Sequence, residues 1–369
     1  MKQSSNASAR LIRLAPIGKI PLFRRMIFLR PLVLLTALAL GPMAFAANAR
    51  KAPTRPGAVD NATAFKGAIV MDAATGHVLL EDRADIVSPP ASMTKLMTFA
   101  VIYDAMQKGT ITLQSPVTVT AADSKIGGTQ VWLKQGEIFP VEELLYAMMI
   151  QSANDAAYAL ARTTAGSVEA FVERMNAKAR ELGMNHTTFR TPHGLPAANR
   201  RVEDGDVTSP RDFALLCRYL VSSTDALKYT SVKERPFGPP VRAQAVAMRN
   251  HDNLIGKVAG VDGLKTGFTN GAGFCLSATA QRDGRRVIVV VMGSPDSKIR
   301  DLKVSEFIER GFAEIPVKLA VATPTTPSAA APSSSPISPA PAASMQPVAA
   351  TPAPAAAGAP AIKFTIPKK

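Results

Sequence analysis

The spacing of apolar residues changes twice along the chain. Apolar runs at 68–71 and 78–80 are separated by a turn-forming segment and predict a β-hairpin. After Pro90, after Pro140 and after Ser167, apolar positions recur at helical spacing and predict three helices. The middle of the chain is therefore expected to be helical.

The later part of the chain returns to the strand period. The segment 274–280 and the β-branched run 287–292 flank Asp283-Gly284, a tight-turn pair, and predict an antiparallel hairpin. The apolar positions of 299–312 then predict a closing helix. Strands at both ends with helices between them predict an α/β domain with an inserted helical lobe.

Composition predicts the boundaries of this folded part. Residues 1–46 contain seven Lys or Arg and no acid, and they lead through a short apolar run to Ala44-Phe45-Ala46. This pattern predicts a signal peptide, with an uncleaved membrane anchor as the alternative and Met26 as an alternative start. The other predicted segments are a linker at 47–62, the folded domain at 63–315 and a disordered Pro-, Ala- and Ser-rich tail at 316–369.

The net charge of +15 does not indicate a nucleic-acid-binding protein. Fourteen of the 43 basic residues lie near the two ends of the chain without an opposing acid, which leaves 29 basic residues against 28 acidic ones in between. The folded part is therefore near neutral and lacks the uniformly basic composition that nucleic-acid binding requires.

Two cysteines, Cys217 and Cys275, occur in apolar segments. We expect two buried thiols rather than a disulfide, because free cysteine is among the residues most often buried. Cysteine and histidine residues do not occur at metal-ligand spacing, so we expect neither a metal nor a cofactor.

Three short motifs with chemical potential follow one another along the chain. Ser92-Met93-Thr94-Lys95 begins the helix after Pro90, and Ser152-Ala153-Asn154 falls in the break between two predicted helices. Lys265-Thr266-Gly267 is expected at the start of a late strand. Each motif alone is explained as a helix start, a cap or a turn, but their order and context together favour one active site.

The spacing of the first motif predicts a nucleophile and its base. Positions i and i+3 share one face of a helix, so Lys95 is expected beside Ser92. A serine hydroxyl becomes a good nucleophile when a base takes its proton. Burial and a second cation, Lys265, would both lower the pKa of Lys95 toward that role. The amino terminus of the helix would favour a developing oxyanion at Ser92.

The other motif residues are predicted to move protons or to bind substrate. Ser152 is expected to pass a proton to a leaving amine, and Asn154 to bond a substrate amide. Lys265 and Thr266 offer a charge and a hydroxyl to a carboxylate. Gly267 would let a peptide backbone lie close to the strand edge.

The motifs and their surroundings resemble the low-molecular-mass penicillin-binding proteins, which are serine-type D-alanyl-D-alanine carboxypeptidases of the β-lactamase/transpeptidase-like superfamily. The resemblance covers about 64–315. It rests on the stretches Pro90-Ala91-Ser92-Met93-Thr94-Lys95-Leu96-Met97-Thr98, Ile150-Gln151-Ser152-Ala153-Asn154-Asp155-Ala156-Ala157, Thr187-Thr188-Phe189, Pro192-His193-Gly194-Leu195 and Val261-Asp262-Gly263-Leu264-Lys265-Thr266-Gly267-Phe268-Thr269.

This resemblance implies an α/β fold of the serine β-lactamase/transpeptidase-like kind, an antiparallel sheet flanked by helices. The activity that it implies is the removal of the terminal D-alanine from peptidoglycan stem peptides ending in D-Ala-D-Ala. It also implies acylation by β-lactams, and an oxyanion hole made by the backbone N–H groups of Ser92 and Phe268. Thr269 joins the substrate-binding residues of the third motif. We further expect export to the periplasm, with peripheral contact with the inner membrane.

Two features depart from the family pattern. A second, β-rich domain is not visible after the folded part, and residues 358–369 show no amphipathic helical pattern. Docking on a membrane through this end of the chain is therefore not expected. Ala153 also occupies a position where family members often have Gly, a small change that we expect to be tolerated.

Three alternative functions remain open at this point. An endopeptidase that cuts peptidoglycan cross-links would carry the same motifs. A β-lactamase would need a deacylating glutamate; Glu181 stands four residues before Asn185, but Gly183 predicts that a helix ends there. An inactive peptidoglycan-binding scaffold would have no use for intact Ser92 and Lys95.

Overall fold

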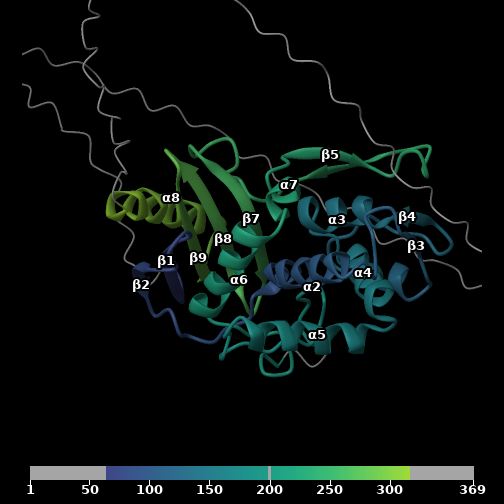
Figure 1. Ribbon diagram of the computed structural model, residues 1–369, viewed down its shortest axis with the longest axis horizontal. Coiled ribbons are helices and arrows are strands. Elements are labelled where there is room, and N and C mark those ends of the chain that lie inside the picture. Colours follow the sequence, from purple (N-terminus) through teal and green to yellow (C-terminus); the bar gives the residue numbers. More distant parts are fainter. Residues whose placement is uncertain (1–63, 198–200, 316–369) are drawn as a thin grey trace, which may run out of the picture. The chain divides into compact units, whose positions relative to one another are not determined.

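A five-stranded antiparallel sheet forms the centre of the structure (Figure 1). The computed structural model describes residues 64–197 and 201–315, so the predictions for 1–46, 47–62 and 316–369 lie outside the described residues. The strand order is β2-β1-β9-β8-β7, in which β1 pairs with both β2 and β9. The strands are β1 (Gly67–Asp72), β2 (Val78–Asp82), β7 (Val261–Thr269), β8 (Gly273–Arg282) and β9 (Arg285–Ser294).

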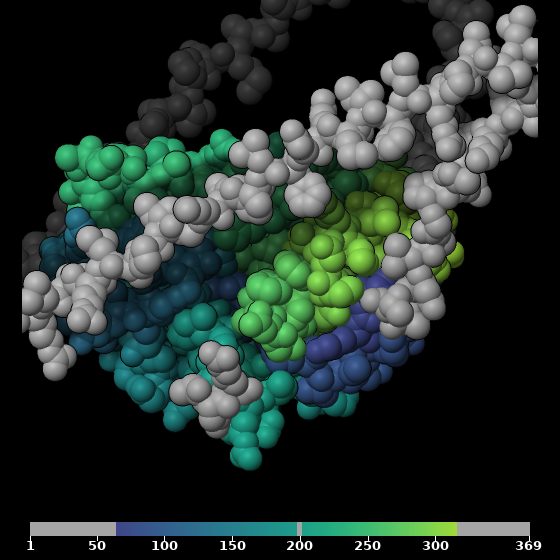
Figure 2. Space-filling view, turned by 180° about the vertical axis from the view of Figure 1, so that it is seen from behind, coloured from purple at the N-terminus to yellow at the C-terminus, as the bar shows by residue number. Residues whose placement is uncertain are grey.

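Both faces of the sheet are buried, which explains the uninterrupted apolar run in β9. Positions 287, 289 and 291 face the core shared with α8 (Ser297–Glu314), and positions 288, 290 and 292 face the core shared with the other helices. Successive side chains of a strand point to opposite faces, so a strand covered on both sides needs an apolar residue at every position. Seen from behind, α8 lies beside β1 and β2 (Figure 2).

A helical lobe is inserted in the sequence between β2 and β7 (Figure 1). Its central helix, α2, has nine buried residues out of thirteen, which accounts for the nearly continuous apolar pattern after Pro90. The elements of the insertion are η1 (Ala91–Thr94), α2 (Lys95–Gln107), β3 (Pro116–Thr118), η2 (Asp123–Lys125), β4 (Ile138–Pro140), α3 (Val141–Ile150), α4 (Asn154–Ala165), α5 (Val168–Glu181), α6 (Pro210–Ser223), α7 (Ala226–Thr230), β5 (Glu234–Phe237) and β6 (Val246–Arg249).

Several boundaries that the sequence predicts are confirmed. The Ser167 hydroxyl accepts the Ala170 N–H at 3.1 Å and caps α5, and Gly183, with a φ of +75°, follows the end of that helix. Helix α3 begins directly after Pro140, and both predicted hairpins form. Cys217 and Cys275 are free and buried, as expected.

The third motif is not at the start of a late strand. It lies in the second half of a separate strand, β7, at the edge of the sheet. The prediction missed this strand because Asp262, Gly263 and Lys265 interrupt its apolar pattern. These three residues belong to the strand because β7 pairs with β8, and not because they are hydrophobic.

The two small sheets and helix α6 were also not predicted. Strands β3, β4 and β5 are three or four residues long and each contains a proline, which weakens the strand pattern. Helix α6 did carry a signal: Ser209 caps it, with its hydroxyl accepting the Asp212 N–H at 3.2 Å, and Pro210 occupies its first turn.

Candidate active site

The first motif places a serine hydroxyl next to a buried amine. Ser92 lies in η1, and Lys95 is the first residue of α2, which continues from it. The Lys95 Nζ lies 3.0 Å from the Ser92 Oγ, and the lysine side chain is fully buried. The helical spacing therefore brings the predicted base within hydrogen-bond distance of the predicted nucleophile.

The Lys95 amine has three hydrogen-bond partners, all of them oxygen atoms. Besides Ser92, the amine donates to the Asn154 Oδ1 at 2.6 Å and to the His193 carbonyl oxygen at 2.7 Å. As an ammonium, Lys95 donates to all three oxygens. As a neutral amine it keeps two donors for the carbonyl oxygens of Asn154 and His193, and its lone pair can then accept the hydroxyl hydrogen of Ser92.

The electrostatics of the site favour the neutral form of the Lys95 amine. Burial, and then the charge of Lys265, lower the pKa of Lys95 well below its ordinary value. Burial lowers the pKa of Lys265 to about 7, against the opposing effect of Asp252. Burial and the nearby Lys95 also lower the pKa of His193 to about 3, so this imidazole stays neutral.

The second motif begins in the three-residue break between α3 and α4 and ends on Asn154, the first residue of α4. Ser152 is buried and has a φ of +64°, a left-handed backbone that non-glycine residues seldom adopt. Both polar ends of the Asn154 side chain are bonded to the protein, since its Nδ2 donates to the Gly127 carbonyl at 2.8 Å. In this structure Asn154 therefore orients Lys95, whereas the sequence predicted a bond to a substrate amide.

The third motif brings the sheet against the nucleophile. Lys265 and Thr266 are buried in β7, while the Phe268 ring is half exposed and stacks on Phe274 with ring centroids 4.2 Å apart. A Cβ added to Gly267 would come within 2.5 Å of the Pro90 carbonyl oxygen, so only glycine lets β7 pack so closely on η1. The Thr269 hydroxyl accepts the Ala272 N–H at 3.1 Å and closes the turn after the strand.

A cavity of about 310 Å³ opens beside Ser92, and residues of all three motifs line it. The sequence did not predict the roles of Thr129, Asn253, Ser297 and Arg300 in this lining, because they are brought here only by tertiary contacts. Its lining residues are Ser92, Thr129, Ser152, His251, Asn253, Thr266, Gly267, Phe268, Phe274, Ser297 and Arg300.

Asp206 is a further residue that the sequence did not single out. Its buried carboxylate accepts the Thr94 hydroxyl at 2.7 Å and the backbone N–H groups of Arg190 and Thr191 at 2.7 and 2.9 Å. It thus joins the first motif to the segment that supplies the His193 carbonyl. Gly194 in that segment has a φ of +82°, and an added Cβ would overlap the Ala91 carbonyl oxygen.

The glutamate that would suit a β-lactamase is not in this cavity. Glu181 is the last residue of α5, its side chain is 64% exposed, and its carboxylate pairs with Lys178 at 2.8 Å. Within residues 64–197 and 201–315, moreover, no three His, Cys, Asp or Glu side chains are grouped so that they would hold a metal ion.

Comparison with known proteins explains this arrangement. A family model described as D-alanyl-D-alanine carboxypeptidase matches residues 51–296. The chain belongs to this carboxypeptidase family. The family resemblance inferred from the motifs is therefore confirmed.

Curated members of the carboxypeptidase family align with about two thirds of the chain. The D-alanyl-D-alanine carboxypeptidase DacF of Bacillus subtilis is 35% identical over 249 residues, which are 68% of this chain and 62% of DacF. DacC of Escherichia coli is 37% identical over 251 residues, which are 66% of this chain and 60% of DacC. The chain thus spans about three fifths of the length of these relatives.

Solved structures of the carboxypeptidase family and related proteins share the fold. The D-alanyl-D-alanine carboxypeptidase DacD from Francisella tularensis has a TM-score of 0.64 at 27% identity, covering 69% of this chain and 71% of that one. Penicillin-binding protein D2 from Listeria monocytogenes, in its ampicillin-bound form, has a TM-score of 0.60 at 30% identity, covering 67% of this chain and 97% of that one. The predicted β-lactamase/transpeptidase-like fold is therefore confirmed.

Proposed function

We propose that the protein is an exported serine D-alanyl-D-alanine carboxypeptidase. It removes the terminal D-alanine from peptidoglycan stem peptides through an acyl-enzyme at Ser92, and penicillins acylate the same serine. Export to the periplasm rests on the basic and apolar pattern of residues 1–46. None of the helices among the described residues is both long and apolar enough to cross a membrane.

The 3.0 Å contact between the Ser92 hydroxyl and the buried Lys95 amine carries this proposal. Lys95 takes the hydroxyl proton as Ser92 attacks the carbonyl carbon between the two D-alanines. The oxyanion that forms lies against the backbone N–H groups of Ser92 and Phe268. Ser152, on the same cavity, passes a proton to the departing D-alanine nitrogen. Water then attacks the ester and releases the shortened peptide.

The far side of the cavity suits the carboxylate at the end of the substrate. Thr266 and Arg300 line it, and Lys265 precedes Thr266 in the buried strand. The Thr266 hydroxyl and the Arg300 guanidinium on the cavity, with the buried ammonium of Lys265 next in the strand, favour a substrate with a free carboxyl terminus. A carboxypeptidase needs this feature, because its substrate ends at the residue it removes.

Two incubations of the purified protein test the proposal, one with a fluorescent penicillin and one with a pentapeptide ending in D-Ala-D-Ala. We expect stable labelling and stoichiometric release of free D-alanine. Rapid loss of the label as hydrolysed drug would indicate a β-lactamase. Cleavage of cross-linked dimers alone would indicate an endopeptidase, and neither label nor D-alanine would leave a peptidoglycan-binding scaffold.

The pH dependence should show the titration of Lys265. If its ammonium binds the substrate carboxylate, kcat/KM for the pentapeptide should fall as the pH rises through about 7, where the free enzyme loses this proton. The fall should reach about tenfold per pH unit well above that pKa. It is measured as D-alanine release between pH 5 and 10 at substrate concentrations below KM.

The matched variant is Lys265→Arg. A guanidinium keeps its proton throughout this range, so the decline above pH 7 should disappear even if the overall rate is lower. An unchanged alkaline limb in Lys265→Arg would show that another group controls it.

A further inference from the structure

Trp132 is a large aromatic side chain exposed on a firmly held loop. Trp132 is the single tryptophan of the sequence, and 59% of its surface is accessible. Its backbone has a φ of +53°, which is unusual for a bulky residue. The neighbours on either side, Val131 and Leu133, are buried and anchor the loop.

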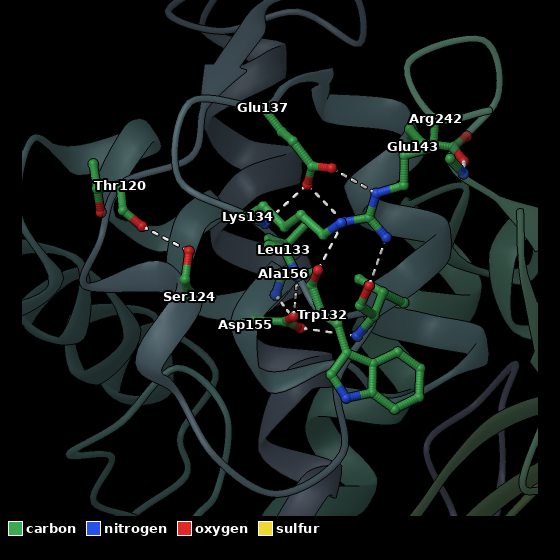
Figure 3. Close-up of polar contacts among 12 residues, drawn as sticks. Thr120, Ser124, Trp132, Leu133, Lys134, Glu137, Glu143, Asp155, Ala156 and Arg242 are labelled. Atoms are coloured by element: carbon green, nitrogen blue, oxygen red, sulfur yellow. Dashed lines mark hydrogen bonds and ion pairs between the residues drawn. The ribbon is translucent and has the colours of Figure 1, made fainter. Parts of the chain in front are cut away.

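Four hydrogen bonds fix the backbone around this tryptophan (Figure 3). The buried Asp155 carboxylate accepts the N–H groups of Val131 and Leu133 at 3.3 and 3.0 Å. Arg242 donates to the carbonyl oxygens of Val131 and Trp132, both at 2.8 Å. The indole points away from these bonds, so the loop holds its backbone in place and leaves the ring free.

A bidentate ion pair in turn holds Arg242, the arginine that bonds to this loop. Arg242 donates to both carboxylate oxygens of Glu137, at 2.7 and 2.6 Å, and Glu137 also accepts the Lys134 N–H at 2.8 Å. Such planar pairs fix the direction of the guanidinium. The conformation that exposes Trp132 is therefore maintained from two sides, by helix α4 and by the segment between β5 and β6.

This loop is continuous with the active-site cavity. Thr129 lines the cavity, and its carbonyl oxygen accepts the Asn154 N–H at 2.8 Å. Trp132 is three residues further, so its Cα lies at most about 11 Å from that of Thr129. A stem peptide of about four residues between the scissile bond and the sugar spans at most about 14 Å. Since Ser92 and Thr129 line the same cavity, these lengths are compatible with a contact between the indole and the sugar that carries the substrate peptide.

We propose that Trp132 is a stacking platform for a sugar ring of the peptidoglycan glycan strand, which makes the enzyme prefer stem peptides still attached to glycan. The inference rests on the function proposed above. One face of a pyranose ring presents C–H groups, and the negative π-face of an indole attracts them. A rigid, half-exposed aromatic ring supplies this contact with little loss of conformational freedom.

Fluorescence tests the platform without catalysis, because Trp132 is the only tryptophan in the chain. The ligand is glycan of alternating N-acetylglucosamine and N-acetylmuramic acid with its peptides removed. We expect a saturable change in tryptophan emission on titrating this glycan into the Ser92→Ala variant. No change at any glycan concentration would overturn the platform.

A kinetic comparison gives the second readout. The ratio of kcat/KM for glycan-linked pentapeptide to that for free pentapeptide should fall about fivefold in Trp132→Ala and less in Trp132→Phe. The rate of penicillin labelling confirms that each variant is folded. Leu302→Ala, which removes an equally exposed apolar side chain on α8, is the matched control and should leave the ratio unchanged.

The outcomes separate this inference from the proposed function. A glycan-induced change in emission without D-alanine release from any substrate would keep the platform and reject the carboxypeptidase. D-Alanine release would keep the carboxypeptidase. If the kcat/KM ratio in Trp132→Ala and the emission on adding glycan were both unchanged, the platform would be rejected. An equal loss on both substrates in Trp132→Ala would mean that the indole contacts the peptide, which overturns the sugar assignment.

Discussion

Ser92→Ala is expected to abolish both penicillin labelling and D-alanine release. The substitution removes the one oxygen within 3.0 Å of the Lys95 amine that can form an acyl-enzyme. Neither Cys217 nor Cys275 can replace it, since both are fully buried and burial raises the pKa of each thiol. Labelling is followed by gel fluorescence and release by an assay for free D-alanine.

The fold should survive this change, because Ser92 lies on the cavity and its hydroxyl contacts only Lys95 among the hydrogen bonds described. An unfolding midpoint close to that of the unaltered protein is the control. D-Alanine release that persists in Ser92→Ala would reject Ser92 as the nucleophile. Penicillin labelling that persists at another residue would show that Ser92 is not the residue that the drug acylates.

Lys95→Met is expected to lower the rate constant of acylation by about a thousandfold, within the range for loss of a general base. Methionine is apolar and of similar length, so it occupies the buried site without adding a charge. Ser92 would keep its position but lose the group that takes its proton. The measurement is the second-order rate constant for labelling by fluorescent penicillin.

A lysine just beyond the end of the same helix serves as the control for Lys95→Met. Lys108 follows the end of α2 and is exposed, so Lys108→Met should acylate at the unaltered rate. Penicillin labelling within tenfold of the unaltered rate in Lys95→Met would show that another group, or water, removes the serine proton. The assignment of Lys95 as base would then be wrong.

Local sequence patterns were sufficient to predict those features that depend on the residues of a single helix or hairpin. The spacing of Ser92 and Lys95 predicted their contact because a single helical turn carries both residues. Apolar periodicity likewise predicted the hairpins and α5, since the burial of each element follows from its own residues. The break that carries Ser152 was visible as the interval between two helical patterns.

Long-range contacts are what the sequence did not reveal. Asp206 bonds to Thr94 across 112 residues of chain, and Arg300 reaches the cavity from the closing helix. The bond from Asn154 to Lys95 depends on how α2 and α4 pack, so the sequence suggested a substrate contact instead. No periodicity encodes such partners, because each pair meets only when the lobe and the sheet assemble.

The close packing around Ala91 restricts which substitutions this protein can accept. Gly194 approaches the Ala91 carbonyl from the loop, and Gly267 approaches Pro90 from the strand, so neither position accepts a larger residue without moving the nucleophile. If penicillins acylate Ser92 as proposed, substitutions that lower drug sensitivity are therefore expected away from these two glycines. The half-exposed Phe268 side chain lies on the cavity and is not held in this packing by a missing Cβ. Selection with a penicillin would then be expected to change residues on the cavity, such as Phe268, and to leave Gly194 and Gly267 unchanged.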